Sequence, residues 1–204
     1  MKKMLKDVLI LFIITVLAGG VLGFVQKITK EPIAVQKEKA KTEAYETVFE
    51  IADSFKPYDI MSQDEIQNTL IEASFEEQEI TEIVEALDKD GATLGYIVTV
   101  VCKNGYAGDI SFALGILNDL TLNGISILSI SETPGLGMKA EEILVNQFAG
   151  KNVNKFSVTK SGATIDSQID AISGATITSN AITEGVNAGL YLVQNLVVGG
   201  NNHE

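Results

Sequence analysis

The fold is decided by residues 83–131, IVEALDKDGATLGYIVTVVCKNGYAGDISFALGILNDLTLNGISILSIS. Runs of apolar and β-branched residues alternate in this stretch with short links that contain glycine. Asp90-Gly91 is typical of a hairpin turn, and residues 104–108 and Asn123-Gly124 form two further links. Because a parallel pair of strands needs a long crossover connection, links this short indicate antiparallel pairing. The stretch therefore predicts an antiparallel sheet of three or four strands.

Two helices are predicted after this sheet. Residues 138–150, MKAEEILVNQFAG, have the pattern of an amphipathic helix. A second helix is predicted over residues 180–196, with Ser179 or Asn180 as its cap and Glu184 in its first turn. Its apolar stripe consists of Ile182, Val186, Leu190 and Val193. The fold class that follows is α+β, an antiparallel sheet packed by helices.

The N-terminal part of the chain has the composition of a membrane anchor. Residues 8–25, VLILFIITVLAGGVLGFV, contain no charge and as a helix would span roughly 27 Å, close to the hydrocarbon thickness of a bilayer. A cleaved signal peptide is the alternative, since lysines precede the stretch and Val16-Leu17-Ala18 resembles a cleavage site. The apolar stretch continues past that site, which favours a retained transmembrane helix in lipid.

The sequence predicts five segments: a short tail at 1–7, the transmembrane helix at 8–26, a helical stalk or connector at 27–80, a folded domain at 81–198 and a flexible tail at 199–204. The beginning of the connector is rich in Ala, Glu and Lys, which favour helix. Lysines flank the transmembrane helix on both sides, so charge alone leaves its topology open. We expect a single-pass protein of the cell (inner) membrane, with a cytoplasmic N-terminus and the domain on the extracytoplasmic side.

Composition excludes several kinds of site. The net charge is −12, and the first 25 residues hold three lysines and one aspartate, so the acidic excess lies in the remainder. A domain that acidic repels phosphate backbones, and we expect no nucleic-acid partner. With one cysteine, Cys102, the chain cannot form an internal disulfide or a cysteine-ligated iron–sulfur cluster. Its one histidine, His203, is the penultimate residue, where chains are usually frayed, so we expect no Ser-His-Asp triad. We predict no metal site and no catalytic side chain, so redox chemistry would need an organic cofactor. Cys102 lies in an apolar strand, where we expect it to behave as a small hydrophobe.

Residues 170–179, DAISGATITS, lead into the last predicted helix. Three small residues in a row let a bulky group approach the backbone closely. The unpaired N–H groups and dipole of a helix N-terminus favour a phosphate. From the residues alone, a plain serine–glycine loop before a helix cap explains the stretch at least as well.

Three motifs together resemble a known family. The D-x-x-S-G-A-T pattern of residues 170–176 resembles the motif at which a flavin transferase joins FMN through a phosphoester to the final threonine. Residues 132–137, ETPGLG, match a second motif of the same FMN-binding domains, and residues 105–110, GYAGDI, resemble a third. The set is similar to the G subunit of Rnf ion-translocating ferredoxin:NAD oxidoreductases and to the C subunit of Na⁺-translocating NADH:quinone oxidoreductases. The short chain fits the Rnf protein better.

The resemblance implies a covalent FMN on Thr176 and recognition of Asp170 by the transferase. It also implies that the loop from Thr133 to Gly137 packs against the flavin, with Leu136 covering the ring and Gly135 and Gly137 permitting contact. Glu132 has an alternative role, a hydrogen bond to the backbone of its own loop. The implied cofactor-binding set is Thr176, Ser173, Gly174, Ala175, Thr178, Glu132, Thr133, Gly135, Leu136 and Gly137.

A second copy of the threonine motif lies upstream. Residues 161–165, SGATI, repeat the five letters that begin at Ser173. At three positions before the serine, the downstream copy has an aspartate where the upstream copy has Val158. Only the downstream copy leads directly into a strong helix, so the flavin is assigned to Thr176 and Thr164 is kept as the alternative.

The function implied by the resemblance is that of an electron-carrying subunit of a membrane-bound, ion-translocating oxidoreductase complex. Its partners would be the other membrane, flavin and iron–sulfur subunits, with a flavin transferase during maturation, and it would have no substrate site of its own. Three alternatives stay open: the C subunit of the quinone-reducing complex, a free-standing anchored flavoprotein that feeds an extracytoplasmic reductase, and a scaffold domain without a cofactor.

Overall fold

The computed structural model describes residues 2–58 and 61–199. The chain divides into two units, one up to Lys41 and a compact one from Thr42 onward. All strands and the remaining helices belong to the second unit. Of the predicted tail at 199–204, only Gly199 lies within the described residues, as the last residue of a helix.

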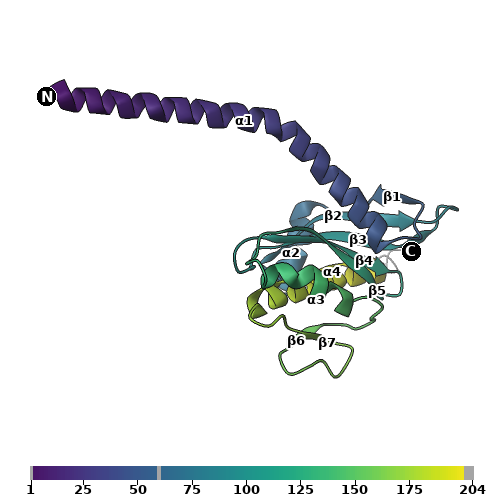
Figure 1. Ribbon diagram of the computed structural model, residues 1–204. Coiled ribbons are helices and arrows are strands. Elements are labelled where there is room, and N and C mark those ends of the chain that lie inside the picture. The colour runs from purple at the N-terminus through teal and green to yellow at the C-terminus, as the bar shows by residue number, and fades with distance from the viewer. Residues whose placement is uncertain (1, 59–60, 200–204) are drawn as a thin grey trace. The chain divides into compact units, whose positions relative to one another are not determined.

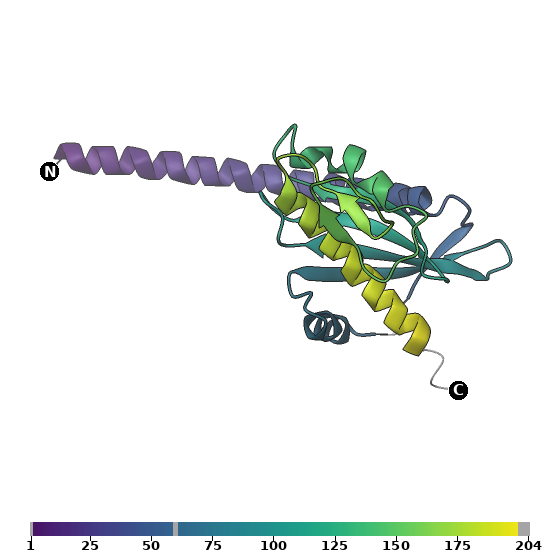
Figure 2. The same cartoon turned by 90° about the horizontal axis from the view of Figure 1, so that it is seen from below.

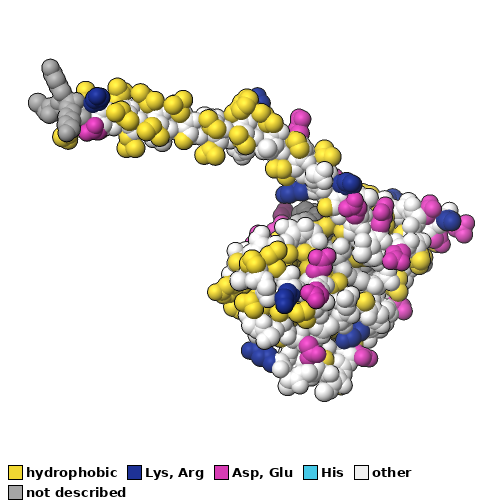
Figure 3. Space-filling model, in the orientation of Figure 1, with side chains coloured by type: hydrophobic (Ala, Val, Ile, Leu, Met, Phe, Trp, Pro, Cys, Tyr) yellow, Lys and Arg dark blue, Asp and Glu magenta, His cyan; other side chains and the backbone are white. Residues whose placement is uncertain are grey.

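The first unit is a single helix. Helix α1 (Lys2–Val48) starts near the N-terminus and continues into the second unit (Figure 1). Within the described part of the chain it is the one helix that is long and apolar enough to cross a membrane: its most apolar 18-residue window has a mean hydropathy of 2.8 and is not buried in the protein. Figure 3 shows apolar side chains covering this part of the helix. The finding agrees with a membrane anchor at the predicted place.

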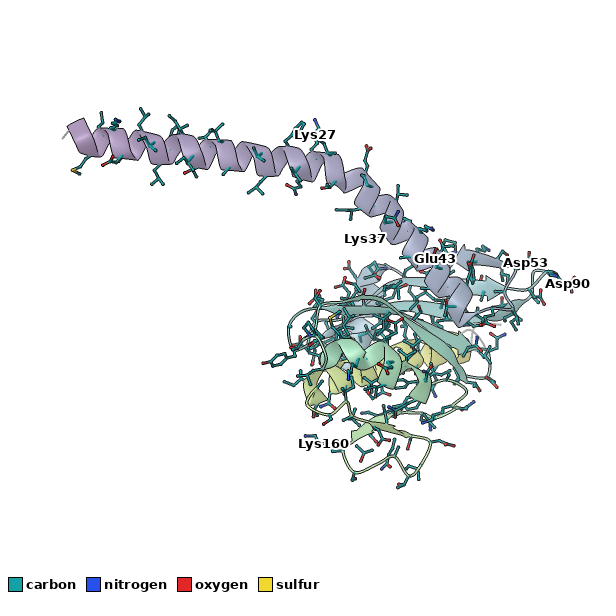
Figure 4. All side chains as sticks on the ribbon, in the orientation of Figure 1. Lys27, Lys37, Glu43, Asp53, Asp90 and Lys160 are labelled. Carbon is teal, nitrogen blue, oxygen red and sulfur yellow. The ribbon has the colours of Figure 1, made fainter. Side chains whose placement is uncertain are left out.

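The second unit is built on a five-stranded sheet in which every neighbouring pair is antiparallel and the spatial order follows the chain. The predicted antiparallel sheet is therefore confirmed, with one more strand at its edge. Gly91, in the predicted hairpin turn, has a φ of +80°, which glycine adopts without strain. Figure 4 labels its neighbour Asp90 at the tip of that hairpin. The strands are β1 (Ser54–Pro57), β2 (Gln78–Leu87), β3 (Thr93–Cys102), β4 (Ile110–Leu117) and β5 (Leu122–Ile130).

The structure places residues 42–80 in the compact unit, which differs from the predicted connector over 27–80. Strand β1 pairs along β2, and the short helix α2 (Gln63–Glu72) follows it. A capping box begins α2: the Ser62 N–H donates to Glu65 Oε2 at 2.8 Å, and the Glu65 N–H donates to Ser62 Oγ at 3.3 Å. The helix is held to the domain because its Ile66 and Leu70 are buried.

Both faces of the sheet are covered. Helix α4 (Thr176–Gly199) lies across one face, as Figure 2 shows, and the last turns of α1 pack on the other through Tyr45, Val48 and Phe49. Since side chains alternate along a strand, Val98 and Val100 of β3 join the core on the α4 side, while Ile97 joins the core on the α1 side. Burial of one such large side chain contributes about 1.5–3 kcal/mol.

Two glycines allow α4 to approach the sheet closely. A Cβ on Gly185 would collide with Cys102 Sγ and lie 2.9 Å from Phe112 Cζ. A Cβ on Gly189, one turn later, would lie 2.5 Å from Leu114 Cδ2. The predicted stripe of Ile182, Val186, Leu190 and Val193 is buried on this same face, which confirms the prediction. The position of the N-terminus of α4 is fixed by this packing.

The predicted helix over residues 138–150 is wrong. Three short pieces replace it, namely η1 (Gly137–Lys139), α3 (Ala140–Ile143) and η2 (Val145–Gln147). The side chain of Gln147 donates both to the Ile143 carbonyl, at 2.9 Å, and to the Asp170 carbonyl, at 3.1 Å. Gln147 thus ties this segment to Asp170, a tertiary contact that helical periodicity in the sequence does not take into account. Strands β6 (Ser157–Thr159) and β7 (Gln168–Asp170) then form a small parallel pair.

Candidate functional site

Helix α4 starts at Thr176 instead of Asn180. Ser179, predicted as a cap, lies in the first turn, where its hydroxyl donates to the Ala175 carbonyl at 2.9 Å and accepts from the Ile172 N–H at 3.0 Å. The predicted caps are therefore wrong, because Ser179 ties the preceding turn to the helix. Glu184 also lies beyond the first turn, contrary to the prediction.

The residues before α4 form a tight turn. The Ala175 N–H donates to the Ile172 carbonyl at 3.0 Å, and Gly174 between them has a φ of +77°. Glycine with positive φ at the third position is what a type II turn requires. This turn brings the threonine that follows it to the surface, at the first position of the helix. Thr176 is half-buried there.

The loop after β5 repeats this local structure. The Leu136 N–H donates to the Thr133 carbonyl at 3.1 Å, with Pro134 at the second position and Gly135, φ +78°, at the third. The loop then passes against α4, since a Cβ on Gly137 would lie 2.8 Å from Thr178 Oγ1. The two turns therefore face one another across a short distance: a Cβ on Gly174 would lie 3.2 Å from Leu136 Cδ2.

Glu132 joins this loop to the link between β3 and β4. Its Oε1 accepts the N–H of Tyr106 at 2.7 Å and the N–H of Ala107 at 3.4 Å. The bond is thus made to another loop, and the expected alternative, a bond within its own loop, is not the one observed. The side chain is 4% exposed, and among the described residues its Oε2 has no hydrogen-bond partner. A buried polar oxygen without a partner is rare in folded proteins.

A cavity of about 430 Å³ lies where these three segments meet. Buried polar side chains, Glu132 and Thr178, form part of its wall, and exposed apolar side chains, Tyr106, Leu136 and Ile177, form another part. Figure 3 shows a group of apolar side chains in the region of α3 and the start of α4, with Lys and acidic side chains beside it. The wall consists of Tyr106, Glu132, Thr133, Leu136, Gly137, Gly174, Ala175, Thr176, Ile177 and Thr178.

Most of the residues named from the sequence lie in this wall. Ser173 and Gly135 do not; each lies in one of the two turns and shapes it. Tyr106 and Ile177 lie in the wall without having been named as site residues. The GYAGDI motif was the available signal for Tyr106, and adjacency to Thr176 was the signal for Ile177.

Asp170 lies at the end of β7 and outside the cavity wall. Its backbone is held by the amide of Gln147, which accepts the Asp170 N–H at 2.7 Å and donates to the Asp170 carbonyl at 3.1 Å. No sequence motif pointed to Gln147. Its contact fixes the strand from which the turn before Thr176 departs.

Thr164 has different surroundings from Thr176. It lies in the exposed connection between β6 and β7, where its N–H and hydroxyl both donate to Gln168 Oε1, at 3.0 and 3.1 Å. Figure 4 labels Lys160 in the same connection. Thr164 is no part of the cavity wall and begins no helix. The two copies of the motif thus differ in the structure as they do in sequence context.

Cys102 lies under Gly185 of α4. It is fully buried, as expected for a cysteine that behaves as a small hydrophobe. Burial, and secondarily the negative charge of Glu184, raise the pKa of the Cys102 thiol to about 12. A thiol with so high a pKa is unreactive near neutral pH.

Comparisons with known proteins find related sequences and a similar solved structure. Residues 105–191 match the FMN-binding domain family, and residues 1–48 match the RnfG N-terminal region. The chain is 33% identical over 197 residues to the G subunit of the Na(+)-translocating ferredoxin:NAD(+) oxidoreductase complex of Acetobacterium woodii, a match that covers 96% of this chain and 94% of the relative. It is 27% identical to the G subunit of the ion-translocating oxidoreductase complex of Pseudoalteromonas atlantica, over 93% of this chain and 88% of the relative. The crystal structure of Shewanella oneidensis NqrC superposes with a TM-score of 0.49 and 19% identity, over 59% of this chain and 61% of that chain.

Proposed function

Since the chain belongs to the family of G subunits of ion-translocating ferredoxin:NAD(+) oxidoreductase complexes, we propose that it is the electron-carrying subunit of such a complex, anchored in the membrane by residues 8–26. We also propose that the cavity binds FMN, joined by a phosphoester to Thr176 Oγ1. The match to the FMN-binding domain spans residues 105–191 and so includes every residue of the cavity wall, which supports the choice of cofactor.

The observation that carries the proposal is the position of Thr176, in the cavity wall and at the first residue of α4. The first N–H groups of a helix have no partner within the helix, and the helix dipole adds partial positive charge there. A phosphate on Thr176 Oγ1 would lie beside these groups and be stabilised by them. Thr164, in its exposed connection, has no such surroundings.

The residues of the wall fit a flavin. The cavity of about 430 Å³ is within the usual range for a bound small molecule. Tyr106, Leu136 and Ile177 supply exposed apolar surface for an aromatic ring system, and buried Glu132 supplies a polar oxygen without a partner among the described residues. When bound, FMN supplies an isoalloxazine ring that accepts and returns one or two electrons.

The chain's own groups would bind, orient and retain the cofactor. Attachment replaces the O–H bond of Thr176 by an O–P bond, so the proton and the leaving group of an activated flavin nucleotide both depart within the transferase. Relative to FMN, the adduct lacks one water. Ser179 and Gln147 hold the backbone around the attachment point in place through the bonds described above. We propose that Asp170, held by Gln147, is the residue that the transferase recognises.

Flavin fluorescence of the denatured chain tests the attachment. Wild type, Thr176→Ala, Thr176→Ser and Thr164→Ala are produced in a host that contains the transferase. We expect covalent fluorescence in wild type and Thr164→Ala, its loss in Thr176→Ala, and partial retention in Thr176→Ser, which keeps a hydroxyl. Undiminished covalent flavin in Thr176→Ala would refute the assignment.

Membership of a complex is tested by purification from the native membrane. We propose that the partners are the other membrane, flavin and iron–sulfur subunits, and that the domain lies on the extracytoplasmic side. A tag on the C-terminus should co-purify a ferredoxin-oxidising, NAD-reducing assembly. Protease added to intact cells freed of their outer layers should degrade the domain. Purification of the chain alone from gently solubilised membranes would favour a free-standing flavoprotein.

A further inference from the structure

The two carboxylate oxygens of Glu132 have different surroundings. Oε1 accepts two backbone N–H groups, those of Tyr106 at 2.7 Å and Ala107 at 3.4 Å. Oε2 accepts none among the described residues and exposes less than 1 Å² of surface. The same side chain forms part of the cavity wall. One oxygen therefore holds a loop in place, and the other is left without a structural role.

The surroundings of Glu132 keep the carboxylate in this place. A Cβ on Gly137 would lie 2.7 Å from Glu132 Cβ, and a Cβ on Gly105 would lie 2.9 Å from Glu132 Oε1. Two glycines thus make room for the Glu132 side chain. If that side chain only filled space, an apolar residue would do so at a lower cost in free energy, because it would bury no polar oxygen. An unpaired buried oxygen of this kind calls for a donor that the protein does not itself provide.

We propose that Glu132 Oε2 accepts the imide N–H of the flavin ring, which makes Glu132 the residue that selects and orients the ring in the cavity; this inference rests on the proposed function. The oxidised isoalloxazine has one ring N–H, placed between two carbonyl groups, and a carboxylate oxygen is a strong acceptor for it. The terminal torsion of a glutamate is broad, so the carboxylate can adjust about its last bond when the ring enters. Leu136, 41% exposed, can move aside to admit the ring.

The charge of Glu132 has a consequence for redox chemistry. A negative charge beside the ring opposes the addition of electrons, and the effect is strong where water is excluded. Glu132 therefore holds the flavin potential below the value that a neutral acceptor would give. The residue acts on the cofactor through contact and charge and takes no part in the covalent attachment at Thr176.

Glu132→Gln is the informative variant. Because the N–H groups of Tyr106 and Ala107 require an acceptor, the amide oxygen of the glutamine takes the place of Oε1, and its NH₂ group takes the place of Oε2. The loop is kept, while the acceptor for the ring is replaced by a donor and the charge is lost. Glu142→Gln, on the exposed side of α3, removes the same charge away from the cavity and is the matched control.

Three measurements on the full-length chain in detergent test the proposed contact between Glu132 and the flavin ring. These are the covalent FMN content by mass, the midpoint potential of the flavin, and hydrogen exchange of the imide N–H with ¹⁵N-labelled FMN. In Glu132→Gln we expect undiminished loading and a potential raised by at least the equivalent of a tenfold shift in the redox equilibrium, about 30 mV for a two-electron couple. We also expect the imide proton of wild type to exchange at least tenfold more slowly than that of free FMN, with Glu142→Gln equal to wild type.

The possible outcomes distinguish a failure of this inference from a failure of the proposed function. A loaded Glu132→Gln protein with the potential and exchange rate of wild type overturns this inference and leaves the proposed function intact. Wild-type protein without FMN on Thr176 overturns the proposed function itself. If Glu132→Gln does not fold, wild type decides alone: slow exchange of the imide proton supports the inference, and exchange as fast as in free FMN refutes it.

Discussion

Gly137 and Thr178 lie so close together that the loop after β5 and the first turn of α4 form one continuous wall. A Cβ on Gly137 would lie 2.8 Å from Thr178 Oγ1, and 2.7 Å from the Cβ of Glu132 on its other side. This close contact between the loop and the helix is possible because Gly137 has no side chain. It aligns the loop over residues 132–137 with the start of the helix that carries Thr176.

Gly137→Ala should consequently separate the two parts of the wall. The added methyl group has no space, so we expect a loss of stability of about 1–3 kcal/mol, measured as a lower Tm of the full chain in detergent, together with reduced flavin loading. Gly108→Ala is the control, because its Cβ would meet only Ser131 Cβ, at an ordinary 3.9 Å. Equal Tm values for the two variants would contradict this account of the wall.

Gly185→Ala tests the packing that positions α4. Its Cβ would collide with Cys102 Sγ and crowd Phe112, so α4 must move away from the sheet. We expect destabilisation of about 1–3 kcal/mol, or roughly 2–4 °C of Tm per kcal/mol for a domain of this size. Gly124→Ala, whose Cβ would lie 3.8 Å from Val48 Cα, should change Tm little. A Tm for Gly185→Ala equal to that of wild type would show that α4 is not held by this contact.

Cys102 should make stability depend on alkaline pH. Burial raises the pKa of its thiol from 9.0 to about 12, so above about pH 9 the unfolded chain loses a proton that the folded chain retains. Stability then falls as pH rises through this window, by about 1.4 kcal/mol per pH unit for one group. Cys102→Ala should lower stability at pH 7 by creating a small cavity, yet show a shallower loss between pH 9 and pH 11. Parallel pH profiles of wild type and variant would contradict the prediction.

We expect the full chain and its compact unit to behave differently when membranes are extracted. Full-length protein should stay with the membrane on alkaline extraction, because residues 8–26 form an apolar helix that is not buried in the protein. A fragment over residues 42–204 should appear in the soluble fraction with the strand content of the full chain, since it contains the sheet and both of its covering layers. Extraction of the full chain under the same conditions would argue against the anchor.

The parts of the fold that could be predicted from the sequence are those that depend on interactions between residues close together in the chain. The Asp90-Gly91 turn follows from glycine's access to positive φ, and the α4 stripe that includes Ile182 and Val186 follows from helical periodicity. Strand β1 gives no such signal, because its four residues, SFKP, are mostly exposed and end in proline. It forms through pairing with β2, which is a tertiary contact, and proline is tolerated there because β1 is an edge strand.

In the candidate site, too, some features follow from neighbouring residues and others depend on contacts between distant segments of the chain. Ser179 has a strong local preference for a cap, but its hydroxyl binds the Ile172 N–H, a group that arrives only when the turn before α4 has formed. Tyr106 reaches the cavity because Glu132, 26 residues later in the chain, holds its backbone. Contacts between distant segments of this kind are not encoded in spacing, so the residues could be named only where a motif drew attention to them.

Peptide mass analysis of the chain purified from its native membrane tests the central claim most directly. We expect the peptide containing Thr176 to carry the mass of FMN less one water, and the peptide containing Thr164 to be unmodified. An unmodified Thr176 peptide from intact, yellow protein would contradict covalent attachment at the start of α4, and the same added mass on the Thr164 peptide would transfer the attachment point to the exposed connection between β6 and β7.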